Sequence, residues 1–252
     1  MRIERPRTRF VGIDFTDLSH GETIDALTRA GTEPDFTTVI TPNVDHIVRM
    51  DRITGTPLGD RYAAAVRDAD FRLCDSRILA RLARVRGVSL QVVTGSDLTA
   101  AIFANHLKSG DRIAIIGGDD TNIADLAPIT LGIDIIQHIP PMGMLHDDGA
   151  MDRAARFICD AQSRFIFVAV GNPQGEILLQ RARKLGAKSG VALSIGASID
   201  FLTGRQTRAP RLVQRLGFEW AYRLLTEPKR LWRRYLVDGP RIFAIVMRNS
   251  DR

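Results

Sequence analysis

The stretch FIFVAVGNPQGEILLQRARKLGAKSGVALSI, residues 165–195, reads as a complete strand–helix–strand unit. Phe165 to Val170 is a short apolar run. Gly175 to Leu185 has the composition of a helix that Gly186 ends, and Val191 to Ile195 is a second apolar run. Short apolar strands joined by one helix are typical of a βαβ unit, in which the two strands run parallel. The stretch therefore predicts an α/β fold.

The same alternation extends toward the N-terminus. Further strands are expected at Phe10 to Phe15, Thr37 to Thr41, Asp70 to Cys74, Arg112 to Ile116 and Ile133 to Ile139. Helices are expected from the Ser19 cap to Ala30, after Asp75, at Thr121 to Leu126 and at Met151 to Gln162. This pattern predicts a Rossmann-like, mostly parallel sheet flanked by helices over residues 1–203.

The pattern changes after Gly204. Pro210 to Leu225 has the apolar spacing of a helix, which Pro228 ends. Thr226 is expected to cap a second helix, with Pro228 in its first turn, that runs to about Leu236. Residues 204–252 are therefore predicted to form a helical appendage, packed on the sheet domain or hinged to it.

Composition is that of a globular protein with a sizeable core. The 252 residues are 44% hydrophobic and 25% charged, and the two cysteines are far apart, which favours reduced thiols in the cytoplasm. No apolar run approaches the roughly 20 residues of a membrane-spanning helix, and the basic N-terminus lacks the apolar segment of a signal peptide. We expect a cytoplasmic protein unless something holds it to a surface.

Positive charge is concentrated at one end of the chain. The net charge is +6, yet residues 204–252 alone contain 12 Lys and Arg against 4 Asp and Glu, a balance of +8. The preceding 203 residues have a balance of −2. A basic terminal segment predicts an anionic partner, which could be phospholipid, a diphosphate or nucleic acid.

Polar clusters follow several of the predicted strands. In parallel α/β sheets ligands bind beyond the carboxyl ends of the strands, so these clusters predict a polar pocket at one edge of the sheet. The clusters are Thr41-Pro42-Asn43, Asp75-Ser76, Gly117-Gly118-Asp119, Gly171-Asn172-Pro173-Gln174-Gly175-Glu176 and Gly196-Ala197-Ser198-Ile199-Asp200.

Each cluster has a functional and a structural interpretation. Asp75 is placed to take a proton from an attacking hydroxyl, but an Asp before a helix is more often an N-cap. Thr41 and Asn43 could bind a sugar or phosphate, or could simply form a turn. Gly117 and Gly171 could let backbone N–H groups approach a diphosphate, although strand-end turns are the commoner reason for glycine. The residues alone favour the structural interpretation for Asp75 and for the glycines, and leave both interpretations open for Thr41 and Asn43.

Common cofactor and metal motifs are absent from the sequence. It contains no GxGxxG, GxxxxGK[ST], GxSxG or HExxH pattern, and its histidines are scattered. Asp68-Ala69-Asp70 has the DxD form of metal-dependent sugar transferases, but we interpret these two carboxylates as solvated charges. The sequence therefore predicts neither a cofactor nor a metal site.

The C-terminal arginines are interleaved with aromatic residues. Arg223, Arg230 and Arg233 could share one helical face, with Trp220, Trp232 and other apolar side chains between them. Basic and aromatic residues together suit the interface of an anionic membrane. The alternative is a packed helical hairpin whose arginines are only solvated, and confinement of the basic excess to this segment favours the membrane.

A series of motifs extends over nearly the whole chain. They are TPNVDH, ADFRLCDSR, VTGSDL, IAIIGG, VAVGNPQGE, SIGASIDFLTGRQTRAP and FEWAYRLLTEPKRLWRRY, in that order. From roughly Phe10 to Phe243 the sequence resembles the WecG/TagA/CpsF glycosyltransferases.

The resemblance implies inverting, metal-independent sugar transfer from a UDP-sugar to a polyprenyl-diphosphate-linked acceptor at the inner face of the cytoplasmic membrane. Such reactions serve bacterial surface or exopolysaccharide biosynthesis, with sugars of the N-acetylmannosamine, uronic acid or glucose type. Asp75 matches the family's catalytic aspartate, and Thr41 and Asn43 match its TPN motif. Further substrate-binding residues are expected at Gly117, Gly171, Pro173, Gln174, Glu176, Asp200, Arg208, Arg223, Arg230 and Arg233.

Two positions depart from the family pattern. Ser76 stands where the family has Gly, and Gly175 stands where it has Gln, which leaves the choice of donor open. The sugar, the acceptor and the existence of a homo-oligomer are open as well.

Two other functions are weaker alternatives. A nicotinamide-dependent oxidoreductase would need a glycine fingerprint that the sequence lacks. A nucleic-acid-binding module would explain the basic tail but leave the clusters at Asp75 and Asn43 without a role.

Overall fold

Six of the predicted apolar runs form one parallel sheet. In the computed structural model, which describes residues 6–210, 212–213 and 216–249, six strands lie in the order β4-β3-β8-β7-β5-β6, and every neighbouring pair is parallel. The strands are β3 (Thr37–Ile40), β4 (Phe71–Arg72), β5 (Arg112–Gly117), β6 (Asp134–His138), β7 (Phe165–Ala169) and β8 (Val191–Ser194). The predicted Rossmann-like α/β fold is confirmed.

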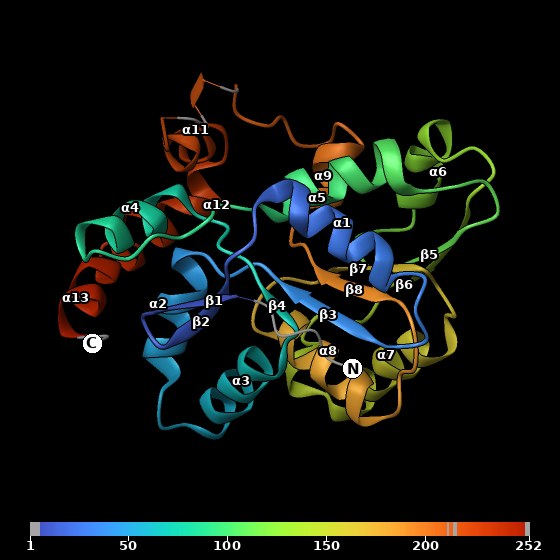
Figure 1. The fold of residues 1–252 in the computed structure, drawn as a ribbon, viewed down its shortest axis with the longest axis horizontal. Coiled ribbons are helices and arrows are strands. Elements are labelled where there is room, and N and C mark those ends of the chain that lie inside the picture. Colours follow the sequence, from blue (N-terminus) through green and yellow to red (C-terminus); the bar gives the residue numbers. More distant parts are fainter. Residues whose placement is uncertain (1–5, 211, 214–215, 250–252) are drawn as a thin grey trace.

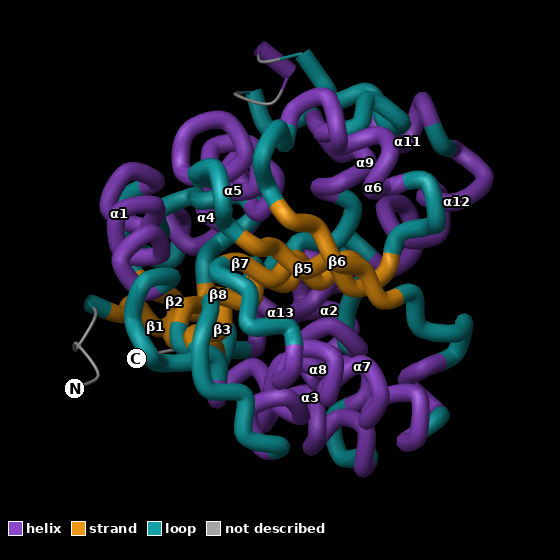
Figure 2. Tube along the Cα trace, turned by 90° about the vertical axis from the view of Figure 1, so that its right-hand side faces the viewer, coloured by secondary structure: helices purple, strands orange, loops and turns teal. Residues whose placement is uncertain are grey.

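Helices cover both faces of the sheet, which forms a central layer (Figures 1 and 2). One face packs against α2 (Val44–Ile53), α3 (Pro57–Asp68), α4 (Arg77–Val85), α7 (Asp148–Asp160) and α8 (Gln174–Lys184). The other packs against α1 (His20–Ala30), α5 (Gly95–Ala101) with the π-helical turn Ile102–His106, α6 (Asn122–Leu126) and α9 (Ser198–Leu202). Alternate residues of β7 enter the two cores, as the period of a strand requires: Ile166 and Val168 on one side, Phe165 and Phe167 on the other.

The prediction of one strand at Phe10 to Phe15 is wrong. The segment is an antiparallel hairpin of β1 (Arg7–Phe10) and β2 (Ile13–Thr16), separate from the main sheet. Val11 and Gly12, between the strands, both have positive φ, which a two-residue type I′ turn requires. The turn was not recognised because Val11 continues the apolar run and is buried together with Phe10 and Ile13.

The C-terminal segment contains α11 (Glu219–Thr226), α12 (Pro228–Trp232), a π-helical segment (Arg233–Asp238) and α13 (Arg241–Arg248). The predicted helix Pro210 to Leu225 is interrupted by a turn at Leu216 and Gly217, where Gly217 has φ +77°. Residues 211, 214 and 215 of that prediction lie outside the described residues. None of the described helices is long and apolar enough to cross a membrane.

Thr226 does not cap the second helix. It is the last residue of α11, and its hydroxyl donates to the backbone oxygens of Tyr222 and Arg223, both at 3.2 Å. Glu227 occupies the N-cap position of α12 and provides no side-chain cap. The threonine hydroxyl therefore bonds back into the helix that it ends.

Helix α13 joins the C-terminal segment to α2. Its buried residues Ile242, Ile245 and Val246 belong to the same core cluster as α2. Ion pairs link the same two regions: Arg52 with Asp238 at 2.7 Å, Arg234 with Asp45 at 3.4 Å, and Arg248 with Asp51. The division of the chain at residue 204 stays a prediction, and these contacts give the appendage a fixed place on α2.

Candidate functional site

A cavity of about 1040 Å³ lies at the carboxyl ends of the central strands. Its wall includes Thr41 after β3, Gly118 after β5, Gly171 after β7 and Ser194 at the end of β8. The connection after β3 leads to α2 on one face, whereas the connection after β8 leads to α9 on the other. Such a change of direction between neighbouring strands opens the crevice in which doubly wound sheets bind ligands.

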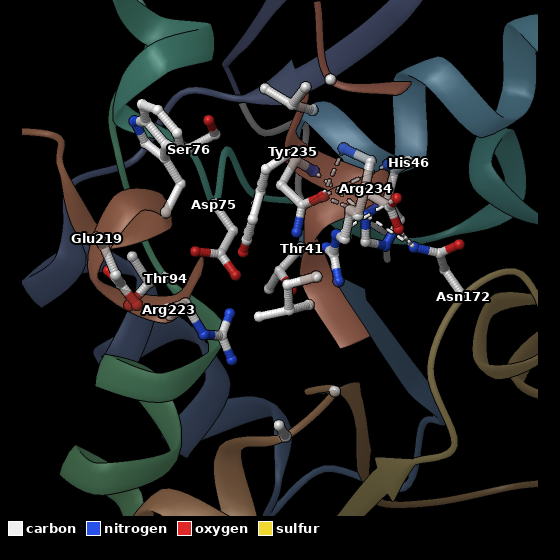
Figure 3. Close-up of a pocket in the computed structure, with 18 of the residues that line it drawn as sticks. Thr41, His46, Asp75, Ser76, Thr94, Asn172, Glu219, Arg223, Arg234 and Tyr235 are labelled. Carbon is white, nitrogen blue, oxygen red and sulfur yellow. Dashed lines mark hydrogen bonds and ion pairs between the residues drawn. The ribbon is translucent and has the colours of Figure 1, made fainter. Parts of the chain in front are cut away.

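The opposite wall of the cavity comes from the C-terminal segment. It contributes Glu219, Trp220, Arg223, Arg234 and Tyr235, among others. The rings of Trp220 and Tyr235 lie 6.1 Å apart at their centroids. The cavity is therefore bounded by the sheet on one side and by the appendage on the other (Figure 3).

Asp75 lies in this cavity and does not cap a helix. The cap of α4 is Ser76, whose Oγ accepts a hydrogen bond from the backbone N–H of Leu79 at 3.1 Å. The Asp75 backbone N–H donates to Pro42 at 3.0 Å, which fixes the residue beside the turn after β3. Figure 3 shows its carboxylate pointing toward Arg223. The structural interpretation of Asp75 as an N-cap is wrong, and its carboxylate stays available to a ligand.

The surroundings of Asp75 raise its proton affinity. Burial raises its pKa to about 7, and the nearby carboxylates of Glu219 and Asp97 act in the same direction. A hydrogen bond with the backbone of Gly95 and the positive charge of Arg223 oppose this shift. A carboxylate whose pKa lies near neutrality can accept a proton and can also keep it, which is the property of a general base.

Thr41 and Asn43 both line the cavity and both have structural bonds. Thr41 Oγ1 donates to the backbone oxygen of Ser194 at 3.3 Å. Asn43 caps α2, because its Oδ1 accepts from the backbone N–H groups of Asp45 at 3.0 Å and His46 at 3.4 Å. These bonds occupy the oxygen of the Asn43 side chain and leave its amide nitrogen as the donor for a ligand.

A buried polar chain lies behind this wall. His46 Nδ1 is 3.0 Å from Asn43 Oδ1, and His46 Nε2 is 3.3 Å from Glu176 Oε1. Ser194 Oγ donates to the same Glu176 oxygen at 2.9 Å. Glu176 is 1% exposed and does not line the cavity, so it supports Asn43 through His46 instead of facing a ligand. Sequence analysis missed His46, although its spacing of three residues from Asn43 is a capping pattern.

The three predicted arginines occupy different positions. Arg223 and Arg230 line the cavity, with Arg223 over the ring of Phe201 at 5.2 Å and Arg230 Nε 2.5 Å from Glu227. Arg233 is exposed and lies outside the cavity lining, where its neighbour Arg234 is found instead. The predicted spacing assumed continuous α-helix, but the chain becomes π-helical at Arg233, which changes the face that each residue presents.

The other predicted binding residues divide into two groups. Those in the cavity lining are Gly171 and Asp200, and burial raises the pKa of Asp200. Those outside it are Gly117, Pro173, Gln174, Glu176 and Arg208. Gln174 donates to the backbone of Val170, and Arg208 forms an ion pair with Asp97 at 2.7 Å. The second group therefore lies outside the cavity lining.

The Asp68-Ala69-Asp70 segment is not a solvated pair. Asp70 is buried, accepts from the backbone N–H of Thr38 at 2.9 Å and forms an ion pair with Arg183, so the prediction for this residue is wrong. Asp68 lies 3.6 Å from the same arginine. Within the described ranges, no three His, Cys, Asp or Glu side chains gather as a metal-holding group.

One comparison with known proteins identifies a family. The model described as "Glycosyl transferase WecG/TagA/CpsF family" matches residues 8–252, essentially the whole chain. The match therefore includes the strand-end clusters, Asp75 and the C-terminal segment that closes the cavity.

Proposed function

Since the chain belongs to the WecG/TagA/CpsF family of glycosyltransferases, we propose that it transfers a sugar from a UDP-sugar to a polyprenyl-diphosphate-linked acceptor. The transfer inverts the anomeric carbon and serves bacterial cell-surface polysaccharide synthesis. The observation that carries this proposal is Asp75, a cavity carboxylate whose pKa is raised to about 7. A base of this strength is suited to a hydroxyl nucleophile near neutral pH.

The proposed reaction is a single displacement. The acceptor hydroxyl oxygen attacks the anomeric carbon while its proton passes to the Asp75 carboxylate. The bond between the anomeric carbon and the diphosphate oxygen breaks, and UDP leaves with the electron pair on the opposite side. Inversion follows because attack and departure occur on opposite faces of the sugar.

Arginines are the proposed electrostatic support for the leaving diphosphate. Arg223, Arg230 and Arg234 lie in the cavity wall that the appendage provides. A planar guanidinium can bind two phosphate oxygens at once, and fixed positive charge stabilises the charge that develops on the leaving group. We propose that no divalent cation is needed. Turnover that EDTA abolishes and Mg²⁺ or Mn²⁺ restores would contradict this part of the proposal.

The exposed side chains of the C-terminal segment support peripheral attachment to the inner face of the cytoplasmic membrane. Trp232 and Met247 are exposed outside the cavity lining, and Leu236 and Phe243 are exposed at its edge. Lys229, Arg233, Arg241 and Arg248 are exposed in the same segment. Exposed apolar side chains with basic neighbours suit shallow insertion among anionic headgroups. Attachment would bring the cavity to a lipid-linked acceptor.

A panel of nucleotide ligands tests the donor class. A ligand that binds only the folded state raises the melting temperature, so we expect a shift with one of UDP-N-acetylmannosamine, its uronic acid or UDP-glucose. NAD⁺ is the control, because it has a diphosphate bridge too, but that bridge joins two nucleosides and neither of them is uridine. UDP release that depends on a polyprenyl-diphosphate-linked acceptor would then support transfer. A shift with NAD⁺ and none with the UDP-sugars would reject the proposal.

A further inference from the structure

Helix α4 has a charge pattern that the count over the whole chain conceals. Residues 76–96 contain four Arg and no Lys, Asp or Glu, although the 203 residues before Gly204 are slightly acidic as a whole. The four, Arg77, Arg81, Arg84 and Arg86, are all exposed. This helix is therefore a local basic stripe in the sheet domain, separate from the basic C-terminal segment.

The stripe contributes little to the stability of α4. Among the described residues no carboxylate forms an ion pair with any of the four arginines. Arg77 and Arg81 are four residues apart and Arg81 and Arg84 three, so they repel one another on one helical face. Arg77 also lies in the first turn, where a positive charge opposes the helix dipole. Arg84 lies in the last turn, where a positive charge is favourable to the dipole, so the favourable and unfavourable effects of the arginines on the helix largely cancel.

The stripe is next to the C-terminal segment. Arg81 Nη2 donates to the backbone oxygen of Leu216 at 2.9 Å, in the turn that precedes α11. Arg77 and Arg81 line the same cavity as Trp220 and Phe243. In Figure 1, α4 lies toward the same end of the molecule as α13, away from α7, and Figure 2 shows α4 on the other side of the molecule from α11 and α12. The basic helix and the appendage thus border one cavity from two sides.

We infer that the arginine stripe of α4 binds the headgroups of anionic phospholipids, so that the membrane-binding surface consists of α4 together with the appendage. The inference rests on the proposed attachment to the membrane and extends it to the sheet domain. Val85 is 84% exposed between Arg84 and Arg86, where an apolar side chain flanked by arginines can enter the interface. Contact on both borders of the cavity places its opening at the lipid surface, where the acceptor lies.

Binding to vesicles tests the inference in the full-length protein. The variant R77Q/R81Q/R84Q is compared with wild type by sedimentation with vesicles of phosphatidylglycerol and phosphatidylcholine. Each basic residue near an anionic surface strengthens binding about fivefold, so we expect a loss on the order of 100-fold. The melting temperature should change little, because removal of the repulsion within α4 offsets loss of the Arg81 hydrogen bond to Leu216.

Matched variants separate the effect of the α4 arginines on vesicle binding from the effect of net charge. R67Q/R153Q/R156Q removes three exposed arginines from α3 and α7, outside the proposed surface, and should bind vesicles as wild type does. R77K/R81K/R84K keeps the charge and should also keep binding. If the triple glutamine variant does not fold, R84Q/R86Q, which is outside the cavity lining, should still lose binding by about 20-fold.

Three results would overturn a role for α4 in membrane binding, and each has a different consequence for the appendage. Equal binding by R77Q/R81Q/R84Q and R67Q/R153Q/R156Q rejects a role for α4 and leaves membrane attachment through the appendage intact. Absence of binding by the wild type to anionic vesicles rejects the proposed attachment and the role of α4 together. Salt-sensitive binding of the wild type to duplex DNA, without vesicle binding, assigns the stripe to another partner and also overturns the inference.

Discussion

At the scale of single residues, Asp75 is the group on which the proposed chemistry depends. Asp75→Asn keeps the shape of the side chain and removes its ability to accept a proton. Base catalysis typically contributes 10²–10⁴-fold, so turnover should fall by roughly that factor while donor binding is retained. Initial rates and the thermal shift with the donor measure the two effects separately. Turnover within a few-fold of wild type would exclude Asp75 as the base.

The same variant should change stability with pH. Because the pKa of Asp75 is raised from 3.8 to about 7 on folding, its contribution to the free energy of unfolding is present below about pH 4. That contribution is lost as the pH rises toward 7, where a buried carboxylate must ionise. The difference in the free energy of unfolding between Asp75→Asn and wild type should therefore rise in favour of the variant between pH 4 and pH 7. Above pH 7 this difference should stay constant. Urea unfolding across this range measures the difference, and a constant difference throughout would contradict the raised pKa.

Glu219, a residue of the appendage, affects the proton affinity of Asp75. Its negative charge raises the pKa of Asp75, so Glu219→Gln should lower that pKa. The base must be ionised to act, and the rising limb of the pH–rate profile should therefore move to lower pH. Arg223→Gln removes an opposing charge and should move the limb to higher pH. Shifts in the same direction for both variants would refute this electrostatic assignment.

At the scale of elements, Gly175 shows how α8 approaches β8. A Cβ at this position would lie 2.7 Å from Ser194 Oγ, which is bonded to Glu176. Gly175→Ala should destabilise the protein by about 1–3 kcal/mol through this overlap. In a Ser194→Ala background the overlap is absent, and the same change should cost much less because alanine favours a helix. A double-mutant cycle in urea measures the coupling, and strictly additive effects would show that the contact does not matter.

The helices and strands also show which elements sequence patterns can predict. Apolar runs predicted the central strands nearly to the residue, because strands buried on both faces are nearly continuous runs of apolar and β-branched residues. Helix α13 was not predicted, although Ile242 to Met247 is an apolar run, since the run alone does not distinguish a helix from a strand. The hairpin at Val11 and Gly12 was missed for a related reason: its turn residues are not the polar ones that mark most turns.

At the scale of the whole molecule, the C-terminal segment is part of the core. Removal of residues 204–252 would uncover the surface of α2 on which Ile242, Ile245 and Val246 pack. Each buried aliphatic side chain contributes about 1.5–3 kcal/mol, and total stabilities are only about 5–15 kcal/mol. We expect the shortened chain to unfold at clearly lower urea concentration than the full chain. An unchanged midpoint would instead show a detachable domain.

Point variants make that prediction sharper. Ile245→Ala in the full chain should cost about 2–5 kcal/mol, whereas Phe243→Ala, at an exposed position of the same helix, should cost little. Equal effects would mean that α13 does not dock on α2.

The parallel α/β fold, the polar clusters after the strands and the basic C-terminal segment all follow from the amino-acid sequence. Local patterns suffice for these features, because burial on both faces makes a strand apolar and parallel strands end at one edge of a sheet. Three other features depend on the packing of the folded chain. Arg234 replaces Arg233 at the cavity, Glu176 supports the wall through His46, and α4 contacts the appendage through Arg81. The raised pKa of Asp75 belongs to the same class, since desolvation and the charge of Glu219 arise only when segments distant in sequence pack together.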